Sequence, residues 1–428
     1  MDNYRPRIAD GLLRDKLDAM GAVLVEGAKW CGKTTTAEQA AKSVLYLGDT
    51  DTLISNKQIL DLYPRSLLNG EPPMLIDEWQ EAPVLWDAIR FEVDHRNEDG
   101  QFILTGSSAP SKEKLDMIHH SGTGRFAWIK MRPMSLWESQ ESNGAVSLRN
   151  LFAGETSFAV KSSEYRLEDI AFMMCRGGWP ASLKKKTEKA ALTVAEEYYE
   201  ATVKSDVSKV DGIKRDPEIM KRLMRSLTRH QGTQASLNTI AADISANETD
   251  TISSKRVSDY IQALQKVFVV ENALAWNPNL RSKTAVRTSD THYFVDPAIA
   301  AAALELGPAD LINDLNTMGL LFETMAVRDL RCYADALNGT LYHYRDKNEL
   351  VCDIVMHLRG GRYALIEVKL GGEQNIEEGA ATLKKLSEKI DTTKMKSPSF
   401  LMVLTAVGNY AYARKDGVIV APIGSLKP

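Results

Sequence analysis

Gly27-Ala28-Lys29-Trp30-Cys31-Gly32-Lys33-Thr34 is the stretch on which the fold assignment rests. It fits the pattern G-x-x-x-x-G-K-[ST], in which a glycine-rich turn aims backbone N–H groups at phosphate oxygens. Apolar residues 22–26 before it predict a strand, and residues 35–43 after it predict a helix whose N-terminus attracts anions. The order of strand, loop and helix therefore predicts a nucleotide site.

Each position of this loop has an expected role. Lys33 is expected to reach the β- and γ-phosphates of ATP, and the Thr34 hydroxyl to ligate Mg²⁺. A glycine-rich turn without a ligand is the alternative, and the flanking strand and helix disfavour it. The predicted nucleotide contacts are Gly27, Ala28, Lys29, Trp30, Cys31, Gly32, Lys33, Thr34 and Thr35.

An acidic pair follows a second apolar run, at residues 73–79. Asp77 is expected to hold Mg²⁺ through water, and Glu78 to polarise the water that attacks the γ-phosphate. Alone, such a pair is usually the end of an ordinary strand. Downstream of a phosphate-binding loop it favours a site that hydrolyses ATP to ADP.

Two further polar residues follow predicted strands of the same region. Ser107 comes after the strand at residues 101–105 and is the candidate sensor of the γ-phosphate. A serine-rich turn is the alternative. Arg125 precedes the strand at residues 126–131 and could act on the phosphate of a neighbouring subunit, or simply be solvated.

Length and composition set limits on the class of protein. With 428 residues, 44% hydrophobic and 26% charged, the chain is expected to form two or three globular domains. The net charge of −4 excludes a globally basic nucleic-acid binder. We expect no membrane role, because no signal-peptide pattern or run of about 18–20 apolar residues occurs. The cysteines at 31, 175, 332 and 352 lack C-x-x-C spacing, which disfavours zinc and disulfides and suits the cytoplasm.

Several motifs together carry a family resemblance; they lie at residues 104–108, 124–125, 132–138 and 176–180. The chain resembles AAA+ ATPases and their STAND-like relatives. More narrowly, it resembles a prokaryotic family of "ATP-binding proteins" with a C-terminal domain of unknown function. The resemblance implies a parallel sheet between helices, with ATP at the carboxyl ends of the strands. The expected domains are an AAA+-type P-loop domain (1–160), a helical lid with a winged helix (161–305) and a nuclease-like α/β domain (306–428).

The middle region predicts two helices, at residues 236–244 and 253–264, followed by a hairpin at residues 267–276 and 292–295. This is the element order of a winged helix. Lys255 and Arg256 near the start of the second helix suit contact with DNA. The hairpin tip adds Arg281, Lys283 and Arg287. The alternative is a module that packs within the protein or binds another protein.

Acidic residues and a lysine converge in the C-terminal region. Asp353 ends one predicted strand, and Glu367 and Lys369 share a face of the next, beyond a glycine turn. Glu323 lies on an upstream helix. The set resembles the PD-(D/E)xK nuclease superfamily, in which Asp353, Glu367 and Glu323 would ligate Mg²⁺ and Lys369 would assist catalysis. Cys352 stands where that pattern has proline, and an inert scaffold or a sensor of DNA ends is the alternative.

Two functions agree with these features. The first is a Mg²⁺-dependent ATPase coupled to DNA binding or processing. The second is a STAND-like nucleotide-dependent switch that acts through protein partners or a homo-oligomer, with an inert nuclease-like domain.

Overall fold

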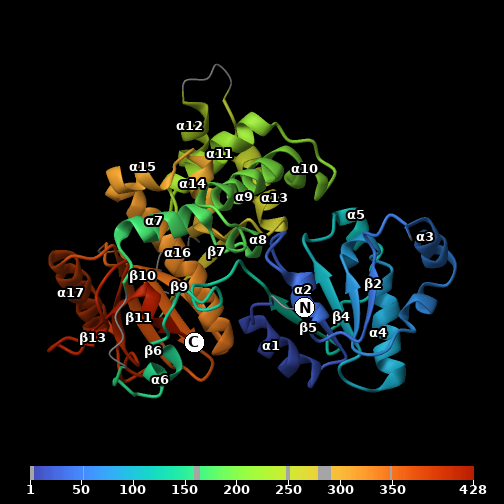
Figure 1. The fold of residues 1–428 in the computed structure, drawn as a ribbon, viewed down its shortest axis with the longest axis horizontal. Coiled ribbons are helices and arrows are strands. Elements are labelled where there is room, and N and C mark those ends of the chain that lie inside the picture. Colours follow the sequence, from blue (N-terminus) through green and yellow to red (C-terminus); the bar gives the residue numbers. More distant parts are fainter. Residues whose placement is uncertain (1–3, 52, 159–163, 247–250, 278–290, 348) are drawn as a thin grey trace. The chain divides into compact units, whose positions relative to one another are not determined.

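The computed structural model describes residues 4–428 except 52, 159–163, 247–250, 278–290 and 348 (Figure 1). Its contacts divide the chain into two compact units. The first contains Met1–Pro133, Thr202–Arg215 and Ile261–Val269; the second contains Met134–Ala201, Asp216–Tyr260 and Val270–Pro428. No helix in these described stretches is both long enough and apolar enough to span a membrane.

The first unit is built on a five-stranded sheet whose strands are all parallel. The strands, in spatial order, are β2 (Ser43–Tyr46), β3 (Met74–Asp77), β4 (Phe102–Gly106), β1 (Ala22–Glu26) and β5 (Phe126–Lys130). The first four residues of β1 are buried, as expected of a strand with helices on both faces of its sheet. The predicted parallel α/β sheet is confirmed.

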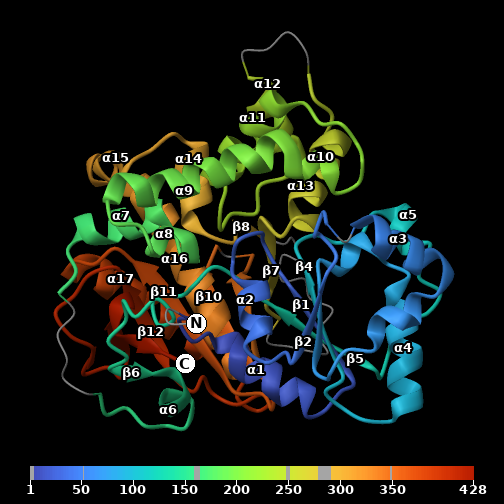
Figure 2. The same cartoon turned by 45° about the vertical axis from the view of Figure 1, so that its right-hand side comes forward.

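Helices cover both faces of this sheet. Ala22 and Leu24 of β1 share one apolar cluster with Leu85 and Ile89 of α4 (Leu85–Arg96). On the other side, α1 (Ile8–Leu17) and α2 (Lys33–Glu38) contact β1, and both views show them beside the sheet (Figures 1 and 2). The remaining α-helices described before residue 133 are α3 (Leu53–Leu62) and α5 (Lys112–Leu115).

The loop helix α2 is shorter than the sequence predicts. It begins at Lys33 and ends at Glu38, whereas the prediction was a helix over residues 35–43. Pairing of strands overrides helix propensity there, because the Lys42 amide donates to the Pro73 carbonyl (2.9 Å) and Ser43 already pairs with Met74.

Two segments from later in the chain fold with this first unit. One holds the π-helix Thr202–Asp206 and α10 (Val207–Lys209). The other is the C-terminal part of α13 (Ser254–Lys266) with the residues that follow it. The Ala109 amide donates to the Lys266 carbonyl (2.8 Å), so the second segment meets the chain just beyond β4.

The second unit is built on a mixed eight-stranded sheet. Its central strand β10 is antiparallel to both neighbours, whereas β11, β12 and β14 run parallel. In spatial order the strands are β13 (Tyr412–Ala413), β14 (Ile419–Pro422), β12 (Leu401–Thr405), β11 (Tyr363–Lys369), β10 (Val351–Leu358), β9 (Gly339–Arg345), β7 (Val270–Ala275) and β8 (Thr291–Phe294). A separate small sheet pairs β6 (Val146–Ser147) with β15 (Leu426–Lys427).

Two long helices pack on the mixed sheet, α16 (Leu315–Ala336) and α17 (Glu373–Lys389). Leu383 and Leu386 of α17 share an apolar cluster with Tyr363 and Leu365 of β11. Shorter helices complete the unit: α6 (Leu148–Phe152), α7 (Leu167–Arg176), α8 (Pro180–Leu183), α9 (Glu188–Ala201), α11 (Pro217–Arg229), α12 (Leu237–Ser245), α14 (Pro297–Ala303) and α15 (Pro308–Asn313).

The predicted hairpin forms, but it belongs to the C-terminal sheet. Strand β7 is antiparallel to β8 and also pairs in parallel with β9. The expected domain boundaries near residues 160 and 305 remain predictions. The eight-stranded sheet contains strands from both sides of residue 305. Arg281, Lys283 and Arg287 lie outside the described residues.

Candidate nucleotide site and carboxylate cluster

The phosphate-binding loop lies against the end of β5. A Cβ atom on Gly27 would lie 2.0 Å from the Met131 carbonyl oxygen, so no larger residue fits there. Arg7, which is buried, donates to the carbonyls of Cys31 (2.7 Å) and Arg132 (2.8 Å). These bonds tie the loop to the chain beyond β5, a role that the sequence did not indicate for Arg7.

The lysine of the motif is folded into its own loop. Lys33 is 5% exposed, and its Nζ donates to the carbonyls of Gly27 and Ala28, both at 2.9 Å. Its ammonium therefore lies inside the loop, against the backbone of the loop's first two residues. Phosphate oxygens could take over from these two neutral acceptors.

The two residues predicted to hold Mg²⁺ are in direct contact. The Thr34 hydroxyl donates to Asp77 Oδ1 at 2.7 Å, although the two residues are 43 positions apart. Thr105, at the end of β4, donates to the same oxygen at 2.6 Å. A hydroxyl and a carboxylate are suitable oxygen ligands for Mg²⁺. Thr105 was not predicted, although it lies two residues before Ser107 on the same chain segment.

Glu78 lies directly beyond β3 in a left-handed backbone conformation, with φ 58° and ψ 49°. For a residue other than glycine this costs about 1–3 kcal/mol, and such positions gather at functional sites. Ser107 Oγ donates to Glu78 Oε2 at 2.8 Å, and the Gln80 amide donates to the same oxygen. The predicted base and the predicted sensor are thus brought together, and Gln80 joins them.

The other predicted residues of this unit lie differently. Arg125 is 42% exposed and pairs with Asp94 on α4 (2.7 Å), which lowers the pKa of Asp94. Its action on a neighbouring subunit remains a prediction. Trp30 is exposed on the loop, and so is Thr35 on α2. Lys29 forms an ion pair with Asp206 at 2.6 Å.

The predicted C-terminal carboxylates also gather. Asp353 Oδ2 accepts a hydrogen bond from the amide of Val368 (2.8 Å), the residue of β11 between Glu367 and Lys369. Lys369 Nζ lies 3.3 Å from Glu367 Oε2. Burial, and then the charge of Asp353, raise the pKa of Glu367 well above its usual range.

Glu323 approaches the same cluster from α16. Burial and the nearby charge of Asp353 raise the pKa of Glu323 to about 8. The Tyr293 hydroxyl, from β8, donates to Glu323 Oε1 at 2.5 Å. Tyr293 was not predicted to belong here, because the sequence placed it on the wing of a winged helix.

The donor atoms of this cluster suit Mg²⁺, because Mg²⁺ prefers carboxylate oxygens and its charge would offset their mutual repulsion. One oxygen, Glu367 Oε1, is buried without a hydrogen-bond partner. However, within the described ranges, His, Cys, Asp and Glu side chains nowhere gather in threes around a point that could hold a metal ion. The arrangement shown is therefore a set of neighbouring carboxylates and not a formed metal site.

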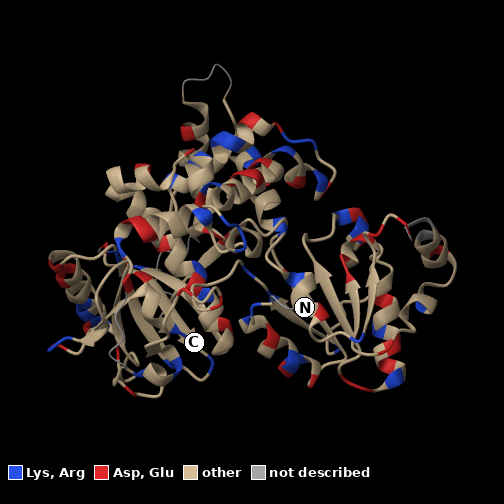
Figure 3. Cartoon of the chain, viewed as in Figure 1, with Lys and Arg blue, Asp and Glu red and all other residues tan. Residues whose placement is uncertain are grey.

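The second predicted helix offers its basic residues to solvent. Lys255 and Arg256 are both exposed on α13. The Arg256 guanidinium lies 5.7 Å from the centre of the Tyr260 ring. Acidic Asp259 is exposed on the same helix. In Figure 3 the helices of the second unit carry both blue segments (Lys and Arg) and red segments (Asp and Glu). The exposed side of α13 therefore carries charges of both signs.

The two family motifs at residues 132–138 and 176–180 have a structural role in the second unit. A Cβ atom on Gly178 would lie 2.1 Å from the Met134 carbonyl oxygen, and the Gly178 amide donates to Asp296 (2.9 Å). Asp296 pairs with Arg328 (3.0 Å), which also pairs with Asp329 (2.8 Å). The motifs at residues 132–138 and 176–180 thereby interlock through α16.

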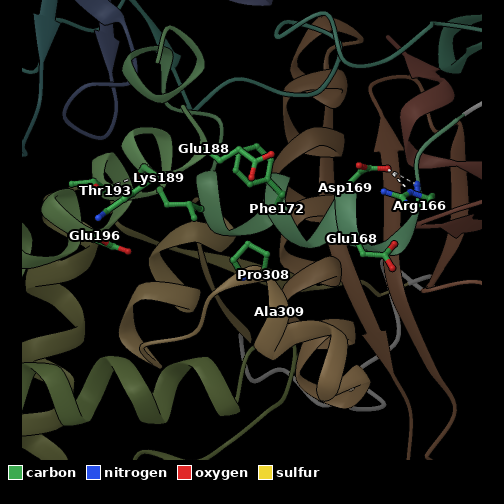
Figure 4. A pocket seen from close by; sticks show the side chains of 11 residues that line it. Arg166, Glu168, Asp169, Phe172, Glu188, Lys189, Thr193, Glu196, Pro308 and Ala309 are labelled. Atoms are coloured by element: carbon green, nitrogen blue, oxygen red, sulfur yellow. Dashed lines mark hydrogen bonds and ion pairs between the residues drawn. The ribbon is translucent and has the colours of Figure 1, made fainter. Parts of the chain in front are cut away.

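An open cavity of about 610 Å³ lies between α7, α9 and the start of α15 (Figure 4). Phe172 lines it, together with charged side chains such as Glu168 and Lys189. None of the predicted site residues lines it.

Three family models match separate parts of the chain. Residues 20–140 match an AAA domain, residues 167–310 a domain of unknown function (DUF8612), and residues 318–426 a domain of unknown function (DUF4143). Two curated relatives are uncharacterized proteins, Mb2031c of Mycobacterium bovis and Rv2008c of Mycobacterium tuberculosis. Each is 22% identical over 365 residues, which cover 85% of this chain and 73% of the relative.

Solved structures give only distant similarity. The Orc1 protein of Aeropyrum pernix in complex with DNA is 13% identical, covers 71% of this chain and 94% of its own, and has a TM-score of 0.27. A STAND protein with a tetratricopeptide repeat sensor, PH0952 of Pyrococcus horikoshii, is 11% identical, covers 79% and 50%, and has a TM-score of 0.22. Scores this low carry no argument about function. The chain therefore contains an AAA-type domain, with the parallel sheet typical of such domains, followed by a region that matches DUF8612 and a C-terminal DUF4143 domain.

Proposed function

We propose that the chain is a Mg²⁺-dependent ATP hydrolase whose nucleotide cycle is coupled to DNA binding or processing by the second unit. One observation carries the hydrolase part. The start of α2 and the ends of β3 and β4 meet in one hydrogen-bonded chain: Thr34 and Thr105 both donate to Asp77, the Glu78 amide donates to Thr105, and Ser107 donates to Glu78. This is the set of groups that phosphoryl transfer to water requires.

Each residue would act on ATP in a defined way. Lys33 would exchange its carbonyl acceptors for phosphate oxygens. Mg²⁺ held by Thr34 and Asp77 would neutralise phosphate charge. Glu78 would orient and deprotonate the attacking water once Ser107 no longer occupies its Oε2. The Ser107 hydroxyl would then be available to the γ-phosphate.

The test is steady-state ATP hydrolysis by the full chain, with nucleotide affinity measured separately with a fluorescent ATP analogue. We expect Lys33→Ala to lose affinity, because a charge-assisted contact to phosphate disappears. Hydrolysis at the wild-type rate in Lys33→Ala would refute the assignment of the site. Arg14→Ala, an exposed position on α1, is the matched control for loss of one positive charge.

The DNA part of the proposal rests on two features of the second unit. These are the exposed Lys255 and Arg256 and the carboxylate cluster with Lys369. Hydrolysis should rise on addition of duplex or single-stranded DNA at low salt, and less at moderate salt. Mg²⁺-dependent cleavage should be lost in Asp353→Ala and Lys369→Ala. No binding and no stimulation at any salt concentration would exclude coupling to DNA.

One observation favours the alternative, a nucleotide-dependent switch that acts through protein partners. Among the described residues, the carboxylates of the C-terminal cluster do not surround a point that could hold a metal ion. An inert nuclease-like domain would lack such a point. Light scattering of the full chain with ADP and with ATP tests this alternative, which predicts a change in mass or a captured partner. In either case the four cysteines, all buried as thiols, agree with a reducing cytoplasm, which we retain as part of the proposal.

A further inference from the structure

The phosphate-binding loop is tied to a segment that lies far away in the sequence. Lys29 Nζ lies 2.6 Å from Asp206 Oδ1, and the two side chains are 44% and 14% exposed. Asp206 is the last residue of a π-helix and immediately precedes α10. Its side chain accepts no capping bond from α10, although aspartate at that position commonly would. The π-helix lies between α9 and α10 without a break, and a π-bulge within a helix frequently occurs at a functional site.

The segment that carries Asp206 is held together internally. Arg215 donates to both oxygens of Asp211 (2.7 and 2.8 Å), which closes the segment on itself. Lys266 Nζ lies 3.4 Å from the same carboxylate. Residues 202–215 therefore form a piece that can respond as a whole when its contact to the loop changes.

The charges of the loop explain why this contact depends on the ligand. Lys33 is buried among carbonyl oxygens, whereas Lys29, the other cation of the loop, is neutralised by Asp206. The phosphates of ATP carry several negative charges, so they compete with a single carboxylate for the Lys29 ammonium. If Lys29 turns to phosphate, Asp206 remains largely buried without its cation, which is unfavourable.

We propose that Asp206 is a positioning residue of the nucleotide site, and that its ion pair with Lys29 is a tie that bound phosphate releases. This inference rests on the proposed function at the ATP site. Residues 202–215 continue directly into α11 and follow directly on α9, both in the second unit. Release of the tie would thus reach the second unit along the chain. By linkage, whatever holds the segment in place would weaken binding of ATP.

The first experiment measures affinity for a fluorescent ATP analogue in the full chain. Asp206→Asn should bind about 2- to 5-fold more tightly than wild type, because it removes a partly exposed ion pair that competes with phosphate. Asp206→Glu should restore the wild-type affinity. Asp18→Asn, an exposed acid beyond α1, is the control for the same change in net charge and should bind like wild type. Equal affinity of Asp206→Asn and wild type would overturn the inference.

The second experiment measures hydrogen exchange of residues 202–215. In wild type, exchange should increase on addition of ATP. In Asp206→Asn and in Lys29→Gln it should already be raised without nucleotide, since each variant breaks the tie from one side. Unchanged exchange in both variants would refute the tie even if ATP does not bind. Absence of ATP binding by wild type, with the tie still detected by exchange, would instead refute the proposed function.

Discussion

Arg328 offers the sharpest test of how the second unit is stabilised. It is 2% exposed and lies between Asp296 and Asp329, both fully buried. We consider Arg328→Met, which keeps an apolar stem of similar length and removes the cation. Both carboxylates would then be buried without a positive partner.

The magnitude follows from what remains bonded. Removing one partner of a buried ion pair costs about 3–5 kcal/mol. Asp296 keeps bonds from the amides of Gly178 and Ala298, both at 2.9 Å, and Asp329 keeps one from Leu136 at 3.0 Å. We therefore expect about 4 kcal/mol and not twice that amount. Such a loss is a large part of the roughly 5–15 kcal/mol that stabilises a typical domain.

Urea denaturation followed by tryptophan fluorescence measures this loss, because the fully buried Trp179 lies in the same motif as Gly178. Burial raises the pKa of Asp329. The loss should therefore be smaller at pH 5 than at pH 8, since Asp329 without its cation can take up a proton more readily at the lower pH. Replacing all three residues, with Asn at both aspartates, should cost less than Arg328→Met alone. A loss below about 1 kcal/mol in the single variant would refute the reasoning.

Three further outcomes are expected. Glu78→Gln should retain affinity for the ATP analogue but hydrolyse ATP at least about 100-fold more slowly than wild type, as for loss of a general base. Hydrolysis at the wild-type rate would make the assignment wrong. Gly178→Ala should lose about 1–3 kcal/mol in urea denaturation, because its Cβ would meet the Met134 carbonyl at 2.1 Å; an unchanged midpoint would contradict this. Burial opposes the shift, but the hydrogen bonds and charge of Arg176 lower the pKa of Glu141 below its usual value of 4.5. The ion pair therefore stabilises the fold above pH 4.5, and this contribution is lost as the pH falls through the lowered pKa. The stability of Glu141→Gln should depend less on pH below that value in acid denaturation, and an unchanged dependence would speak against this explanation.

The gathering of the predicted nucleotide-site residues could be anticipated from sequence because its signals are local. The loop, the acid pair and Ser107 each follow a short apolar strand, and parallel strands place such residues at one edge of a sheet. Thr105 could have been included, since it and Ser107 are two positions apart at the end of β4. The length of α2 could not, because strand pairing at Ser43 decides where the helix ends.

Residues contributed from distant segments escaped prediction. Asp206 and Tyr293 lie 177 and 30 positions away from the residues they contact, and no local pattern marks them. The hairpin strands were predicted, but their place in the C-terminal sheet depends on pairing between β7 and β9. The carboxylates were gathered as expected, whereas their spacing around a metal depends on side-chain positions that a sequence pattern does not specify.

The interleaving of the two units limits how the protein can be dissected. The AAA-type unit takes in Thr202–Arg215 and Ile261–Val269, so the chain passes between units at several points. A fragment that stops at Pro133 would lack the partner of Lys29 and the carbonyl that Ala109 donates to. It would expose backbone and a loop cation that the full chain covers. A separately produced ATPase fragment should therefore behave differently from the same residues in the intact chain, and point substitutions are the sounder way to assign roles to its parts.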